Sequence, residues 1–102
     1  MKSGYRITWT DHTLEELSQA FEYLQSNFSE KEANHLANEI ESVICYISKY
    51  PKIYPESSQQ NGVRRAVVAR FNTLYYSVNI EKNQIEILSF FSNRENPERL
   101  EL

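Results

Sequence analysis

Two amphipathic stretches joined by a very short link constrain the fold of this chain more than any other feature. Between residues 11 and 27, apolar side chains recur at steps of three and four, which is the spacing of one helix face. A second such stretch runs to about Lys49, and Ser29 and Glu32 at its start have the spacing of a capping box. Two helices with so short a link pack as an antiparallel hairpin. Because the hairpin alone cannot bury both apolar faces, we expect a sheet to cover its other side.

The ends of both helices are marked by residues that favour helix starts and stops. Thr10 or Asp11 can cap the first helix, and Pro51 and Pro55 end the second one. The predicted apolar stripes are Leu14, Leu17, Phe21, Leu24 and Phe28 in the first helix, and Ala33, Leu36, Ala37, Ile40, Val43, Ile44 and Ile47 in the second.

The other segments have the composition of strands. Residues 5–9 alternate in polarity, and residues 63–71, 74–80 and 84–91 are rich in Val, Ile, Tyr and Phe. The last three strands are linked by short turns, which predicts an antiparallel meander. The predicted architecture is therefore α+β with the order β-α-α-β-β-β. It has an antiparallel sheet with a helical hairpin packed on one face and the first strand at an edge. A chain of 102 residues is expected to form one domain, spanning residues 1–102.

Charge is unevenly distributed along the chain. The net charge is -3 and the pI about 5.4, which is a poor match for binding nucleic acid through a broad basic face. Residues 1–62 carry nine acidic and five basic side chains, whereas residues 63–102 carry five acidic and six basic ones. We therefore expect an anionic partner to contact the second half of the chain.

The chain offers little material for disulfide, metal or cofactor chemistry. Cys45 is the single cysteine, so no internal disulfide can form, and we expect it to be a small core residue on the second helix. His12 and His35 are expected to be exposed on the helices, and they have no metal-ligand spacing with Cys45. No metal site and no cofactor are predicted. The chain shows no signal peptide and no apolar run that could span a membrane, so we expect a cytoplasmic protein.

Four segments, taken in order, resemble the RelE/ParE toxin family of type II toxin–antitoxin systems, also called plasmid stabilisation proteins. The segment ITWTDHTLEEL is similar to the family's first strand and helix start, and ISKYPKIYP is similar to its second helix end. The segment NGVRRAVVARFNTLYYSV resembles the family's central arginine-bearing strand and tyrosine-rich hairpin. The segment IEILSFFSNRENPERL resembles its last strand and the following Arg-Xaa-Xaa-Pro element. The resemblance covers nearly the whole chain.

This resemblance implies a toxin that a cognate antitoxin neutralises. ParE-like members inhibit growth through a cellular target such as DNA gyrase, and this is the function we favour. RelE-like members are ribosome-dependent mRNA endonucleases that need no metal, which is the alternative. A non-catalytic partner-binding module on the toxin fold is a second alternative. The resemblance also implies assembly as a homodimer or as a toxin–antitoxin hetero-oligomer.

The resemblance points to candidate residues in the second half of the chain. Family nucleases keep an arginine for phosphate just past the last strand, where Arg94 stands, so Arg94 is the candidate catalytic residue. Candidates for binding nucleic acid or a partner are Arg64, Arg65, Arg70, Tyr75, Tyr76, Phe90, Phe91 and Arg94. Adjacent strand residues face opposite sides of a sheet. One residue of each neighbouring pair is therefore expected on the open face and the other toward the helices.

Three positions depart from the pattern of the family nucleases. Thr73 stands at about the position of a strand arginine, Leu100 near that of a C-terminal tyrosine, and Asn93 where a further basic residue is expected. None of these three side chains can replace the missing acid–base or cationic group. The departures favour a ParE-like or a degenerate toxin over one that cleaves mRNA.

Overall fold

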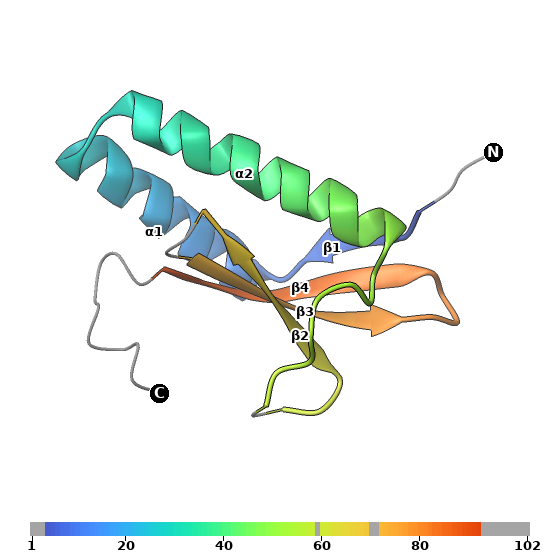
Figure 1. Ribbon diagram of the computed structural model, residues 1–102. Helices are drawn as coiled ribbons and strands as arrows, with labels where there is room; N and C mark the ends of the chain where they lie inside the picture. Colours follow the sequence, from blue (N-terminus) through green and yellow to red (C-terminus); the bar gives the residue numbers. More distant parts are fainter. Residues whose placement is uncertain (1–3, 59, 70–71, 93–102) are drawn as a thin grey trace.

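The chain forms two layers, a helical hairpin lying on one face of a four-stranded sheet (Figure 1). The computed structural model describes residues 4–58, 60–69 and 72–92. The elements are β1 (Arg6–Trp9), α1 (Asp11–Asn27), α2 (Glu30–Lys49), β2 (Val63–Val68), β3 (Asn72–Asn79) and β4 (Gln84–Ser92). The predicted order β-α-α-β-β-β and the single helix layer are confirmed.

The sheet is mixed rather than wholly antiparallel. Its strand order is β1-β4-β3-β2, and β2, β3 and β4 form the predicted antiparallel meander. The first strand lies at an edge, as expected, but it pairs with β4 in parallel. A parallel pair needs a long crossover connection. The helical hairpin, β2 and β3 together supply that connection, which brings β4 back beside β1.

Both helices begin at the residues that the sequence indicates. The Thr10 hydroxyl accepts a hydrogen bond from the Thr13 backbone N–H at 3.1 Å, and the Ser29 hydroxyl accepts one from the Glu32 N–H at 3.3 Å. These side chains satisfy backbone donors that a helix leaves free in its first turn. Local chemistry therefore defines both helix starts, and the short link keeps the helices antiparallel.

The core lies between the two layers. On α2 the buried residues are Ala33, Leu36, Ile40, Val43 and Ile47, all from the predicted stripe, whereas Ala37 of that stripe is exposed. On α1 the stripe is turned relative to the prediction, because Thr13, Ala20 and Leu24 are buried while Leu14 and Phe28 are each 49% exposed. Thr13 can be buried because its hydroxyl donates a hydrogen bond to the Ile87 carbonyl at 3.0 Å.

The prediction that Cys45 is a core residue is wrong, because its side chain is exposed. The buried residues Val43 and Ile47 define the inward side of α2. Cys45 is two positions from each of them, which is about 200° around a helix with 3.6 residues per turn. His12 and His35 are exposed on the helices, as expected.

Candidate functional site

The open face of the sheet, which the helices do not cover, carries the candidate residues that remain accessible (Figure 1). Side chains alternate between the two faces along each strand. In β2 the pattern of buried residues places Ala66 and Val68 toward the helices, which leaves Arg65 and Val67 on the open face. In β3 the alternation places Leu74 and Tyr76 inward and Tyr75 outward.

Strand register then brings three of the predicted residues together. Arg65 is the direct cross-strand partner of Tyr75, and Thr73 of the same strand lies opposite both Val67 and Phe91. Directly opposed side chains have Cβ atoms about 5 Å apart. The open face therefore holds one cation, one phenol and two apolar side chains within a small area. We call this set, Arg65, Val67, Tyr75 and Phe91, the open-face cluster.

The other member of each adjacent pair belongs to the helix side. Tyr76 is fully buried and Phe90 is 2% exposed, so neither presents its ring to a partner in this structure. Arg64 has a side chain only 19% exposed and lies across from Tyr76. Arg70 and Arg94 lie outside the described residues, as do Asn93 and Leu100.

Arg64 and Tyr76 hold the segment that follows α2 against the sheet. The Arg64 guanidinium donates a hydrogen bond to the Tyr54 carbonyl at 2.7 Å, and it lies 3.9 Å from the Glu56 carboxylate. The Tyr76 hydroxyl donates to the Pro51 carbonyl at 2.9 Å. Both residues therefore stabilise the loop by satisfying its backbone acceptors. In this structure, both of these predicted binding residues thus contact a loop of the same chain.

Alkaline pH is expected to destabilise the protein through Tyr76. Burial raises the pKa of its phenol to about 12, although the Arg64 guanidinium opposes part of that rise. Since the folded pKa lies above the usual 10, the neutral phenol stabilises the fold fully below pH 10, and this contribution is lost as the pH rises toward 12. The loss should be about 2 kcal/mol. Urea unfolding of wild type and Tyr76→Phe between pH 8 and about 12 tests this, because the variant should show a shallower decline. Equal slopes would contradict it.

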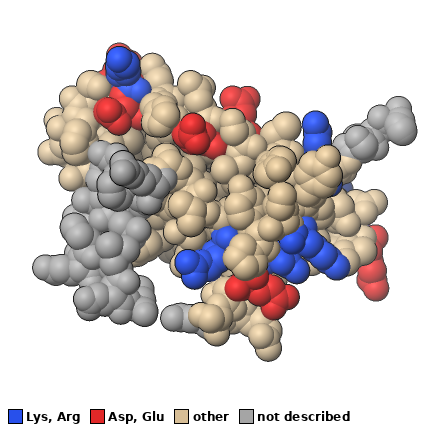
Figure 2. Space-filling view, viewed as in Figure 1, with Lys and Arg blue, Asp and Glu red and all other residues tan. Residues whose placement is uncertain are grey.

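Opposite charges gather on different parts of the molecule. Figure 2 shows acidic side chains along the helices at the top of the view and basic ones mainly below them, with further acidic groups at the bottom and at the right edge. The two helices carry eight acidic side chains, namely Asp11, Glu15, Glu16, Glu22, Glu30, Glu32, Glu39 and Glu41, against Lys31 and Lys49. An anionic partner is therefore repelled from the helix layer and directed toward the sheet.

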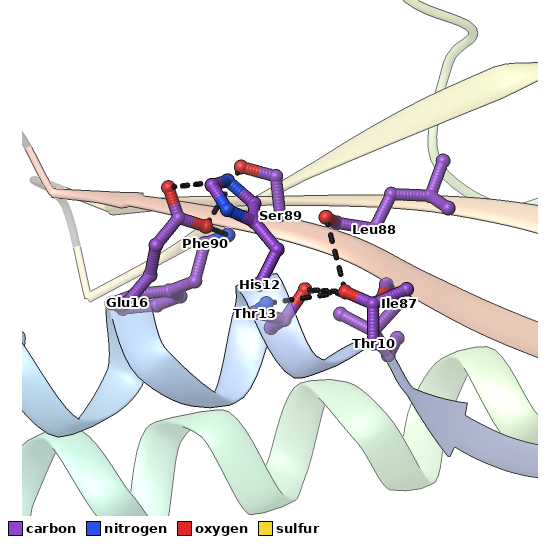
Figure 3. Close-up of polar contacts among 8 residues, drawn as sticks. All are labelled: Thr10, His12, Thr13, Glu16, Ile87, Leu88, Ser89 and Phe90. Atoms are coloured by element: carbon purple, nitrogen blue, oxygen red, sulfur yellow. Dashed lines mark hydrogen bonds and ion pairs between the residues drawn. The ribbon is translucent and has the colours of Figure 1, made fainter.

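The carboxylate of Glu16 on α1 binds the part of the β4 edge that β1 does not pair with (Figure 3). This contact was not predicted from the sequence. One oxygen of Glu16 accepts hydrogen bonds from the Phe90 N–H at 2.8 Å and the Ser89 hydroxyl at 3.0 Å. The other oxygen lies 3.2 Å from His12 Nε2. Since β1 pairs with β4 only as far as Ile87, Glu16 satisfies a backbone donor beyond the end of β1. The contacts of Glu16 with Ser89 and Phe90 join residues more than 70 positions apart, and no local pattern signals them.

Replacing Glu16 by alanine should therefore weaken the join between α1 and β4. Because a hydrogen bond to a charged acceptor contributes more than a neutral one, we expect the free energy of unfolding to fall by about 1.5 to 3 kcal/mol. The exposed neighbour Glu15 offers a matched control, and Glu15→Ala should change stability by less than about 0.5 kcal/mol. Hydrogen exchange of the Phe90 backbone amide should be faster in Glu16→Ala than in wild type, and it should be unchanged in Glu15→Ala. Unchanged protection of that amide would show that Glu16 does not hold the edge.

Among the described residues, no group of three or more His, Cys, Asp or Glu side chains lies where it could hold a metal ion. Within those residues, none of the helices has the length and apolar character needed to cross a membrane. A shallow hollow of about 210 Å³ on the open face is lined by Thr8, Ser77, Asn79, Gln84 and Glu86. Its one charged group is a carboxylate, which does not favour phosphate.

No protein-family model and no curated protein sequence matches the chain. Solved structures do match it. A chain of the chromosomal ParDE toxin–antitoxin system from P. aeruginosa superimposes with a TM-score of 0.72 at 16% identity, covering 86% of this chain and 95% of that one. The chain has a RelE/ParE-like toxin fold. The predicted resemblance in fold is thus confirmed.

Two further structures have the same fold at similarly low sequence identity. A chain of the toxin–antitoxin complex RelBE2 from Mycobacterium tuberculosis gives a TM-score of 0.64 at 15% identity, covering 90% of this chain and 94% of that one. A mutant of E. coli toxin RelE in the free state gives 0.63 at 12% identity, covering 96% and 93%. The RelE/ParE-like fold therefore extends over nearly the whole length of this chain and of its structural neighbours.

Proposed function

We propose that this chain is the toxin of a type II toxin–antitoxin (plasmid stabilisation) system and acts in the cytoplasm. A cognate antitoxin holds it inactive, and the free toxin inhibits growth by binding a cellular target such as DNA gyrase, as ParE-like toxins do. The likeness in fold to a chain of a ParDE system, at a TM-score of 0.72, supports the toxin function. The observation that carries the choice of mechanism is the composition of the open face, which suits binding better than cleavage.

Cleavage of RNA without a metal requires a base, an acid and cations around the scissile phosphate. Among the described strand residues, the titratable side chains on the open face are Arg6, Arg65, Tyr75 and Glu86. Thr73, which lies between Val67 and Phe91 on this face, is neutral. Within the open-face cluster, one arginine flanked by apolar and aromatic side chains resembles a protein-binding surface, where arginine and tyrosine anchors are enriched.

The RelE-like alternative is supported by one specific feature, the pairing of Arg65 with Tyr75 across β2 and β3. A guanidinium can bind phosphate through two parallel hydrogen bonds (bidentate binding), and a phenol ring beside it can stack on a base. This pair could therefore hold mRNA. The two functions predict different first effects in a cell.

Sudden induction of the chain alone in a bacterial host separates these functions. Incorporation of labelled thymidine and of labelled amino acids is followed in parallel. The proposal predicts that DNA synthesis stops first, and that the purified chain inhibits supercoiling by purified gyrase. If protein synthesis stops first and mRNA is cut on ribosomes, the RelE-like function replaces it. If neither process changes while the chain is folded, the remaining function is that of a partner-binding module.

The antitoxin requires its own experiment. Co-expression of the small protein encoded beside the toxin gene should restore growth and give a complex that co-purifies with this chain. The control is the same co-expression with an unrelated antitoxin, which should leave growth arrested. Restoration by both proteins, or by neither, would contradict neutralisation by a cognate partner.

A further inference from the structure

Exposed apolar side chains gather at the end of α2, away from the open-face cluster. Tyr46, Tyr50, Ile53 and Ile80 are 46 to 56% exposed. The Tyr46 and Tyr50 rings meet edge to face with centroids 5.7 Å apart. Tyr50, Ile53 and Ile80 line a hollow of about 530 Å³ together with Tyr5, Lys49 and Lys52. We call Tyr46, Tyr50, Ile53 and Ile80 the α2-end patch.

The backbone beneath this patch is held at several points. The Tyr5 N–H donates to the Ser48 carbonyl at 2.8 Å, and the Ser48 hydroxyl donates to the Tyr5 carbonyl at 2.9 Å. The Ile53 N–H donates to the Tyr50 carbonyl at 3.1 Å, and the Tyr76 hydroxyl holds the Pro51 carbonyl. The Arg6 N–H donates to the Asn83 carbonyl at 2.9 Å, so the start of β1 joins the end of α2 to the β3–β4 turn on the right of Figure 1. A fixed frame lowers the entropy lost when a partner binds.

Charge distinguishes this patch from the rest of the helix layer. Two lysines, Lys49 and Lys52, line the hollow, and none of the described residues lining it is acidic. Glu41 lines a neighbouring hollow with Tyr46 and Tyr50, and Glu39 lies further back on α2. This favours an anionic ligand on the side of the patch that Lys49 and Lys52 line. An acidic partner is therefore attracted to this end of α2 and repelled from the remainder of the helix.

We propose that the α2-end patch is a docking site for an acidic protein segment that carries large apolar side chains. Its apolar anchors would fill the hollow between Tyr50, Ile53 and Ile80, while its carboxylates would pair with Lys49 and Lys52. A symmetric contact with a second copy of this chain fits less well, because it would bring the same lysines together. The aliphatic Ile53 and Ile80 line the hollow beside Tyr50 and suit the apolar side chains of a protein segment. The inference is independent of growth inhibition, since the patch is separate from the open-face cluster.

The test uses the purified full chain and a displayed library of random peptides. Wild type is the bait, and the double variant Ile53→Asp/Ile80→Asp is used to remove peptides that bind elsewhere. Both isoleucines are half-exposed, so the double variant is expected to fold. The recovered peptides should be enriched in Asp and Glu next to Leu, Ile, Phe or Trp. A fluorescent copy of a recovered peptide should bind the double variant, and also Lys49→Glu/Lys52→Glu, at least about ten-fold more weakly.

The matched control is Leu14→Asp, which places the same new charge at an apolar residue 49% exposed on α1. It should bind the peptide as wild type does. The proposal is overturned if no peptide depends on the patch, if recovered peptides are basic, or if binding is equal in all variants. It is also overturned if wild type self-associates through the patch, or binds a single-stranded RNA probe there in place of peptides. None of these outcomes bears on whether the chain arrests growth.

Discussion

Tyr76→Ala is expected to lower the free energy of unfolding by about 3 to 5 kcal/mol, the range for removing a large aromatic side chain from a core. Tyr76 is fully buried between the sheet and the helices, and its hydroxyl satisfies the Pro51 carbonyl. The substitution therefore leaves both a cavity and a backbone acceptor without its partner. Because small domains have a total stability of about 5 to 15 kcal/mol, the variant should be partly unfolded at 37 °C. Urea unfolding followed by circular dichroism measures the difference.

The adjacent tyrosine provides the control. Tyr75 is half-buried on the open face, opposite Arg65 and Ser89, so Tyr75→Ala should lower stability by less than about 1.5 kcal/mol. The two variants delete the same atoms at neighbouring positions, and only the face of the sheet differs. Equal losses in the two variants would show that the assignment of faces in β3 is wrong.

Helix limits and strand content could be predicted because they depend on local chemistry. Thr10 and Ser29 cap helices through backbone donors three residues away, and Pro51 excludes further helix beyond Lys49. The direction of β1 could not be predicted in this way, because its pairing with β4 depends on the path of the chain through all the elements between them. Cys45 was misplaced because it follows Ile44 in the sequence, whereas its angle around α2 points it outward.

For the candidate site, the sequence could predict only that one residue of each adjacent pair lies on the open face, and not which one. Alternation along a strand requires that one residue of each adjacent pair, such as Phe90 and Phe91, faces the helices. Which one does so depends on register, and β4 shifts its register by one residue opposite Tyr75 and Tyr76. Glu16 could not be found from sequence, because its partners at Ser89 and Phe90 become neighbours only when α1 packs on β4.

Arg65→Glu is expected to abolish growth arrest without unfolding the protein. Arg65 is exposed, and it is the cation of the open-face cluster. A hydrogen bond to a charged group contributes about 1.5 to 3 kcal/mol, so deleting it with Arg65→Ala should weaken binding of the target by roughly 10- to 150-fold. Reversing the charge should weaken it further, since a glutamate repels the same partner. Colony formation after induction measures growth arrest, and urea unfolding establishes that each variant is folded.

Two substitutions separate this effect from general changes in charge or stability. Lys82→Glu makes the same charge change at an exposed lysine in the β3–β4 turn and should leave growth arrest intact. Arg64→Ala removes the neighbouring guanidinium, which donates to the Tyr54 carbonyl. It should instead lower the free energy of unfolding by about 1 to 3 kcal/mol. Substitutions of two adjacent arginines on one strand would thus have different effects. Those at Arg65 would weaken target binding, and Arg64→Ala would lower stability. Full toxicity of a folded Arg65→Glu protein would place the target-binding surface away from the open face of the sheet.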